Sequence, residues 1–201
     1  MHMFFSRFRF LLFLPLLFPA AVFSQKQEFD MFMTGKKIGS LVTERKVKGD
    51  VEMYSLVSTA DVSILWKAMS AHTVTNLVFK GGVLTESYYE HKENGVVEKY
   101  CKLSEDGNGG YAVHHWKKGK FNVSPLASFC LINIYYTEPK DGQKMFSESF
   151  GEYITIKKTG PGTYEIKDPA GEKSVYHYTD GRLTETEFHT SIVTVKLKPK
   201  A

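Results

Sequence analysis

The side chains best suited to binding a metal ion are the histidines, and His114 and His115 stand next to each other. Imidazole is a common zinc ligand. If residues 111–117 form a strand, however, adjacent side chains point to opposite faces and cannot share one ion. The other histidines beyond the N-terminal segment are scattered: His72, His91, His177 and His189. No His-x-His or His-Glu-x-x-His spacing links them, so we predict no metal site.

Two acidic residues, Glu185 and Glu187, have the spacing of a carboxylate pair on one face of a strand. Glycoside hydrolases use paired carboxylates, but acidic residues two apart on a strand usually face solvent. The chain lacks Gly-x-Ser-x-Gly, Cys-x-x-Cys and a Gly-rich phosphate loop between strand and helix. We therefore predict no catalytic residue and no cofactor.

The only two cysteines are Cys101 and Cys130. In an oxidising compartment they are a candidate disulfide, which would stabilise the fold by about 3–4 kcal/mol through loop closure. Cys130 stands in an apolar run, which suits an inert buried thiol equally well. The sequence leaves both interpretations open.

Aromatic residues make up 14% of the chain, and many are tyrosines in strand-like segments. Lining a concave surface, they would suit a lipid or another amphipathic ligand. Packed together, they would form an ordinary core, because strands favour aromatic residues. The residues concerned are Tyr88, Tyr89, Tyr111, Trp116, Tyr135, Tyr136, Tyr153, Tyr164, Tyr176 and Tyr178.

The N-terminus has the order of a secretory signal peptide: two arginines, the apolar run 10–18, then small residues. The run contains a proline and is shorter than the ~20 residues of a membrane span. Val22 and Ser24 are suitable −3 and −1 residues for signal peptidase. We expect residues 1–24 to be removed, with Gln25 as the mature N-terminus in the periplasm or outside the cell.

Removal of the signal peptide lowers the net charge from +4 to near +2. Lysine and glutamate alternate along most segments, whereas a nucleic-acid binder concentrates its basic residues in a stripe. The balance therefore argues against nucleic acid as a partner. The remaining residues, 25–201, have the length of one domain with its own core.

Short β-patterned segments separated by Gly, Asn and Asp recur through the chain and predict an antiparallel meander. Asn94-Gly95 is a strong hairpin signal because both residues tolerate positive φ. In the last segment Val193, Val195 and Leu197 alternate with polar residues, which indicates one buried face. Residues 61–69 favour a strand, although 64–69 alone would also suit a helix.

One short helix is expected near residues 125–133, with Ser124 as its cap and Pro125 in its first turn. About ten strands in one sheet cannot stay flat. We therefore predict an all-β fold, a single antiparallel meander curled into a barrel or a half-barrel, with the helix covering the concave side.

Several short motifs follow one another along the chain: Gly35–Gly39, Phe79–Ser87, Asn94-Gly95, Tyr135–Pro139, Phe150–Glu152, Pro169–Gly171, Tyr176–Tyr178 and Gly181–Leu183. In this order they resemble a family of exported proteins from Gram-negative, Bacteroidetes-type bacteria that is defined as a domain of unknown function. The layout is also similar to periplasmic lipoprotein-carrier-like half-barrels, an analogy of fold that does not transfer function. The resemblance implies no activity and no residue roles.

These patterns favour a non-enzymatic exported protein of the periplasm or envelope, which either binds an apolar or lipid-like ligand or associates peripherally with the envelope. The alternative is a hydrolase of envelope carbohydrate or peptide, with polar residues that only the fold brings together. No ligand-binding residue is predicted.

Overall fold

The computed structural model describes residues 23–64, 67–190 and 192–200, and nearly all of its regular structure is β-strand. In this part of the chain no helix is long and apolar enough to cross a membrane. The elements are β1 (Phe23–Met33), β2 (Lys36–Lys48), β3 (Val51–Ile64), β4 (Lys67–Lys80), β5 (Val83–Glu93), β6 (Val96–Glu105), β7 (Tyr111–His115), β8 (Gly119–Val123), the 3-10 helix η1 (Leu131–Tyr135), β9 (Lys144–Ser147), β10 (Glu152–Gly160), β11 (Thr163–Lys167), β12 (Lys173–Thr179), β13 (Arg182–His189) and β14 (Thr194–Pro199).

The predicted signal peptide lies outside the described residues except for Phe23 and Ser24, which begin β1. These two residues pair with Val47 and Lys46 of β2. Cleavage before Gln25 stays a prediction, and it would shorten β1 by these two residues.

The strands form one 14-stranded antiparallel sheet in the order β8-β7-β6-β5-β4-β3-β2-β1-β14-β13-β12-β11-β10-β9. The predicted all-β antiparallel fold is confirmed. Of the two alternatives for its shape, the open one is correct, because β8 and β9 are edges that do not pair with each other. Along the chain, β8 and β9 are consecutive strands. Residues 124–143, here called the crossing segment, must therefore run from one edge of the sheet to the other.

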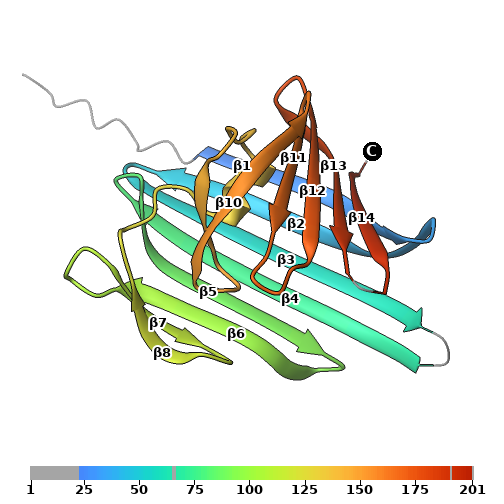
Figure 1. The fold of residues 1–201 in the computed structure, drawn as a ribbon, viewed down its shortest axis with the longest axis horizontal. Coiled ribbons are helices and arrows are strands. Elements are labelled where there is room, and N and C mark those ends of the chain that lie inside the picture. The colour runs from blue at the N-terminus through green and yellow to red at the C-terminus, as the bar shows by residue number, and fades with distance from the viewer. Residues whose placement is uncertain (1–22, 65–66, 191, 201) are drawn as a thin grey trace, which may run out of the picture.

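The two halves of the sheet are joined by the pairing of β1 with β14, from Phe29 opposite Pro199 to Met33 opposite Val195. Figure 1 shows β10–β13 lying across the long strands β2–β5 at a steep angle. The sheet therefore folds over into two layers, and the concave face lies between them. The buried hydrophobic residues of both layers form one cluster.

The local turn signals are confirmed. Asn94 and Gly95 have φ of 50° and 82° and connect β5 to β6, as a two-residue hairpin requires. Asp180 and Gly181, with φ of 50° and 73°, connect β12 to β13 in the same way. The alternative of a helix at 64–69 is wrong at residues 64 and 67–69, because Ile64 of β3 pairs with Lys67 of β4 and Val62 pairs with Met69; residues 65–66 lie outside the described residues.

The predicted helix at 125–133 is present only as the shorter η1, displaced toward the C-terminus. Two backbone carbonyls before η1 accept hydrogen bonds from strands instead of from helical N–H groups. The Ala127 carbonyl accepts a hydrogen bond from Leu84 N (2.8 Å), and the Phe129 carbonyl accepts one from Phe146 N (2.9 Å). Since these carbonyls are bonded to strands β5 and β9, the segment forms no helix before Cys130.

Candidate functional site

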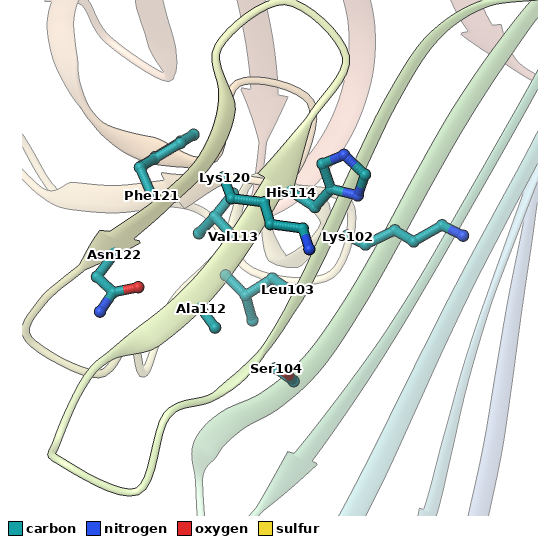
Figure 2. A pocket seen from close by; sticks show the side chains of 9 residues that line it. All are labelled: Lys102, Leu103, Ser104, Ala112, Val113, His114, Lys120, Phe121 and Asn122. Atoms are coloured by element: carbon teal, nitrogen blue, oxygen red, sulfur yellow. The ribbon is translucent and has the colours of Figure 1, made fainter.

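The adjacent histidines lie on opposite faces, as predicted for a strand: His114 is exposed and His115 is buried. They cannot share an ion. His114 borders a surface pocket of about 530 Å³ on strands β6–β8. Figure 2 shows Lys102, His114 and Lys120 around this pocket, which we call the basic pocket. The strand register places these three side chains in one row across the neighbouring strands.

The predicted carboxylate pair, Glu185 and Glu187, lies on the outer face of β13, and Lys196 of β14 bonds to both. The Lys196 Nζ atom is 2.9 Å from an oxygen of each carboxylate. Partial burial alone would raise the pKa of Glu185, but hydrogen bonds from Lys196 and Lys198 hold it below its usual range. A glycosidase needs one carboxylic acid with a raised pKa as proton donor. Glu185 does not meet this requirement, so the pair gives no support to the hydrolase alternative.

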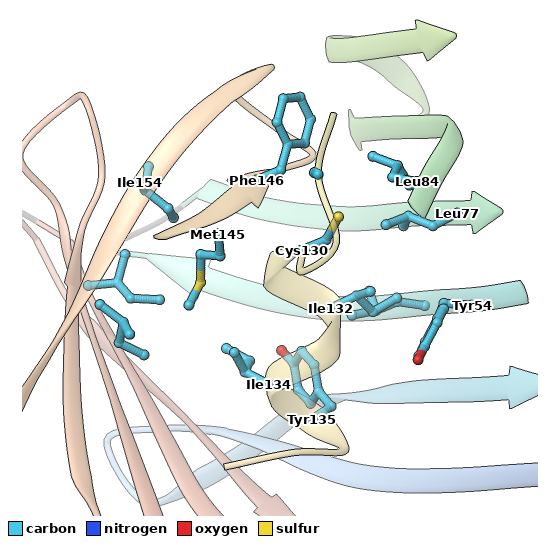
Figure 3. Close-up of a cluster of buried hydrophobic side chains, with 14 of the residues drawn as sticks. Tyr54, Leu77, Leu84, Cys130, Ile132, Ile134, Tyr135, Met145, Phe146 and Ile154 are labelled. Atoms are coloured by element: carbon cyan, nitrogen blue, oxygen red, sulfur yellow. The ribbon is translucent and has the colours of Figure 1, made fainter. Parts of the chain in front are cut away.

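The crossing segment fills the space between the two layers. Figure 3 shows Cys130, Ile132, Ile134 and Tyr135 between the strands of the N-terminal half and Ile154 of β10. Ile134 and Cys130 are completely buried, and Ile132 is 2% exposed. The concave side where a ligand cavity had been one alternative is therefore occupied by the chain itself.

Hydrogen bonds of two buried tyrosines connect the crossing segment to the sheet. The Tyr111 hydroxyl donates to the Leu84 carbonyl (2.9 Å) and accepts from Ala127 N (2.7 Å). The Tyr178 hydroxyl donates to the Ile134 carbonyl over 2.6 Å. Each bond satisfies a backbone group that the interior hides from water.

Two further tyrosines of the second layer make similar contacts. Tyr153 donates to the Pro125 carbonyl (2.6 Å), and Tyr164 donates to the Glu138 carboxylate (2.8 Å). By contrast, Trp116 is 42% exposed on the outside. Most of the aromatic residues singled out in the sequence thus pack around the crossing segment instead of lining an open concave face.

The aromatic core reaches the surface at a cleft of about 490 Å³, which we call the end cleft. It lies where the start of β1, the end of η1, the β12–β13 turn and the end of β14 meet. Phe29, Tyr135 and Leu183 line it, and each is at most 7% exposed. The bottom of the cleft therefore reaches core side chains, whereas most of the surface that lines it is polar.

Charged side chains surround the end cleft. Glu28 is paired with Lys26 (2.6 Å) and with Lys200 (3.2 Å). Arg182 is exposed, and among the described residues no carboxylate lies within 4.0 Å of its guanidinium. The cleft thus combines a mostly polar lining, a few core side chains at its bottom and one unpaired cation.

Comparison with known proteins gives a match over residues 29–200 to the model of a family described as domain of unknown function DUF6134. The chain belongs to this family. Origin in Bacteroidetes-type bacteria stays a prediction. No curated protein matches the sequence. A crystal structure of a DUF1089 family protein from Pseudomonas aeruginosa is similar over 87% of this chain and 94% of that chain, with 12% sequence identity and a TM-score of 0.36.

Both cysteines of this DUF6134 domain are buried. Cys101 is 1% exposed, and burial raises the pKa of its thiol to about 12. Burial raises the pKa of the Cys130 thiol as well. These surroundings suit the buried-thiol interpretation, and a bridge between the two residues stays a prediction.

The DUF6134 core also holds a buried acid that sequence reasoning missed. Glu148 is 4% exposed, and its Oε1 atom accepts a hydrogen bond from Ile132 N at the start of η1 (2.9 Å). Burial raises the pKa of Glu148 to about 7, against the smaller opposing effect of this bond. Its sequence neighbours, Phe146 to Ser149, show no pattern that marks an acid as buried. Glu148 is buried because the crossing segment runs between the sheet edges and places Ile132 against it, which no local sequence pattern reveals.

Proposed function

We propose that this protein is an exported, non-enzymatic protein of the bacterial envelope or periplasm that binds a single-chain amphipathic molecule with an anionic head group in the end cleft. The N-terminal order of charged, apolar and small residues supports export. The observation that carries the binding proposal is that core residues Phe29, Tyr135 and Leu183 line a surface cleft beside the unpaired Arg182.

The two parts of such a ligand would find different partners. An acyl chain placed on Phe29 and Leu183 would leave water, and each buried methylene contributes about 0.8 kcal/mol. A carboxylate or phosphate head group would pair with Arg182, whose planar guanidinium can donate two parallel hydrogen bonds. The volume of about 490 Å³ is within the usual range of small-molecule sites, which favours one acyl chain over a lipid with several.

Calorimetric titration with a series of alkyl carboxylates, each below its micellar concentration, tests this proposal. Affinity should rise about fourfold per added methylene until the cleft is full. Arg182→Glu should weaken carboxylate binding at least about tenfold, which corresponds to loss of a charge-assisted pair. It should leave the alcohol of equal chain length almost unaffected.

Lys120→Glu in the basic pocket is the matched control, since it makes the same change from cation to anion on a distant outer face. Equal effects of the two variants, or affinity independent of chain length, would contradict binding in the end cleft. Export is tested separately: cell fractionation of the native host followed by N-terminal sequencing should find a chain that starts at Gln25.

A further inference from the structure

Four metal-ligating side chains meet on the outer face of the second layer, away from the end cleft. They are His177 on β12 and Glu185, Glu187 and His189 on β13. His177 is the direct cross-strand partner of Glu185. Glu187 and His189 follow at two-residue intervals and so project to the same face. Sequence spacing did not reveal this group, because its members come from two strands.

The ligand atoms are close together. His189 Nε2 is 3.1 Å from Glu187 Oε2, and His177 Nε2 is 3.7 Å from Glu187 Oε1. One ligand atom from each of His177, Glu185 and Glu187 lies within 4.8 Å of the others. Ligand atoms around a tetrahedral Zn²⁺ are about 3.4 Å apart, as follows from Zn–N and Zn–O distances near 2.0–2.2 Å. Small side-chain rotations would therefore bring these atoms into a coordination sphere.

A second contact orients one of the imidazoles. His189 Nδ1 is 3.0 Å from the hydroxyl oxygen of Thr194 on β14. This bond turns the other ring nitrogen, Nε2, toward Glu187. Histidines that bind metals commonly have such an outer partner on the second ring nitrogen, which fixes the orientation of the ring.

A positive charge already stands at the centre of the cluster. Lys196 Nζ is 2.9 Å from Glu185 Oε1 and 2.9 Å from Glu187 Oε1. The ammonium group compensates two half-buried carboxylates, as a metal ion would. Its side chain is 43% exposed and has a long flexible stem, so it can swing into solvent when another cation arrives.

We propose that His177, Glu185, Glu187 and His189 bind a divalent transition metal ion, represented by Zn²⁺, in competition with Lys196. Two imidazoles and two carboxylates form a donor set that suits zinc and its neighbours, whereas magnesium and calcium prefer oxygen ligands alone. The site is separate from the end cleft, so the result for zinc does not depend on whether the cleft binds a ligand.

The test is calorimetric titration of ZnCl₂ into the full protein after dialysis against a chelator. We expect wild-type protein to bind one equivalent of Zn²⁺. His177→Gln should weaken binding at least tenfold, and Lys196→Met should strengthen it about tenfold, since the competing ammonium is gone. His114→Gln and Lys173→Met are the matched controls. His114 is an outer-face histidine of β7, and Lys173 pairs with a single carboxylate, Glu165.

Circular dichroism spectra of the variants test whether unfolding causes any loss of zinc binding. His189→Gln provides a second ligand variant. Absence of Zn²⁺ binding by wild-type protein would overturn the proposal, including the case in which Lys196→Met alone binds. Binding that His177→Gln and His189→Gln leave unchanged would overturn it equally. A purely structural role of the cluster as a salt-bridge network predicts no gain of zinc affinity in Lys196→Met.

Discussion

The Tyr178 hydroxyl and the Ile134 carbonyl oxygen are joined by a 2.6 Å hydrogen bond that connects β12 to η1. Ile134 is completely buried and Tyr178 is 7% exposed. Since the crossing segment links the two edges of an open sheet, such bonds hold it between the layers. The stability of the fold should therefore depend on them.

Tyr178→Phe should lower the free energy of unfolding by about 1–3 kcal/mol, because it leaves the buried Ile134 carbonyl without its partner. Urea denaturation followed by tryptophan fluorescence measures this change. Tyr88→Phe is the control: its hydroxyl bonds to Glu90 on the outer face, and its removal should cost less than about 0.5 kcal/mol. Equal losses in the two variants would show that the Tyr178 bond does not hold the segment.

Glu148→Gln should change how stability depends on pH. The pKa of Glu148 is about 7 in the folded protein and near 4.5 in the unfolded chain. Between these values the folded state keeps a proton that the unfolded state releases. The contribution of Glu148 to the free energy of unfolding is thus complete below pH 4.5. About 3 kcal/mol of it is lost as the pH rises through 7.

The glutamine variant removes this loss and keeps an acceptor for Ile132 N. Its stability relative to wild type should therefore increase between pH 4.5 and 7.5. Burial lowers the pKa of His115, which acts in the opposite direction, but this contribution is common to both proteins and cancels in the difference. Glu172→Gln is the control, because it makes the same change at an exposed position. A pH-independent difference for Glu148→Gln would refute the raised pKa.

Gly151→Ala should destabilise the packing of the two layers. Gly151 has φ of +66°, and a Cβ there would lie 2.8 Å from Val113 Cγ1 and 3.1 Å from Cys101 Sγ. Gly171→Ala is the control, with φ of +87° and no atom within 4 Å of the added Cβ. Backbone strain should cost both variants about 1 kcal/mol. Thermal denaturation should show a further loss of about 1–3 kcal/mol in Gly151→Ala alone.

Thiol titration distinguishes the two interpretations of the cysteines. Burial and the raised pKa of Cys101 should keep both thiols unreactive toward a thiol reagent at pH 8 in the native protein. In protein purified after export, two thiols should react with the reagent under denaturing, non-reducing conditions. Finding no thiol under these conditions would instead establish the disulfide between Cys101 and Cys130.

The strands and their turns could be predicted from sequence because both are local properties. Alternation in the segment of Val195 and Leu197 indicates a strand with one buried side, and Asn94-Gly95 supplies the backbone freedom of a two-residue hairpin. The helix near 125–133 was predicted too long, because its local cap signals compete with backbone bonds to β5 and β9. Those bonds depend on residues more than ten positions away.

Strand periodicity in the sequence is enough to predict an all-β antiparallel fold whose sheet must curve. Three features appear only in the folded chain: the sheet stays open, residues 124–143 fill its concave face, and His177, Glu187 and Lys196 meet on the outside. The physical reason is that strand periodicity acts between neighbours along the chain. Cross-strand register and the path between the two sheet edges bring together residues that no local spacing connects.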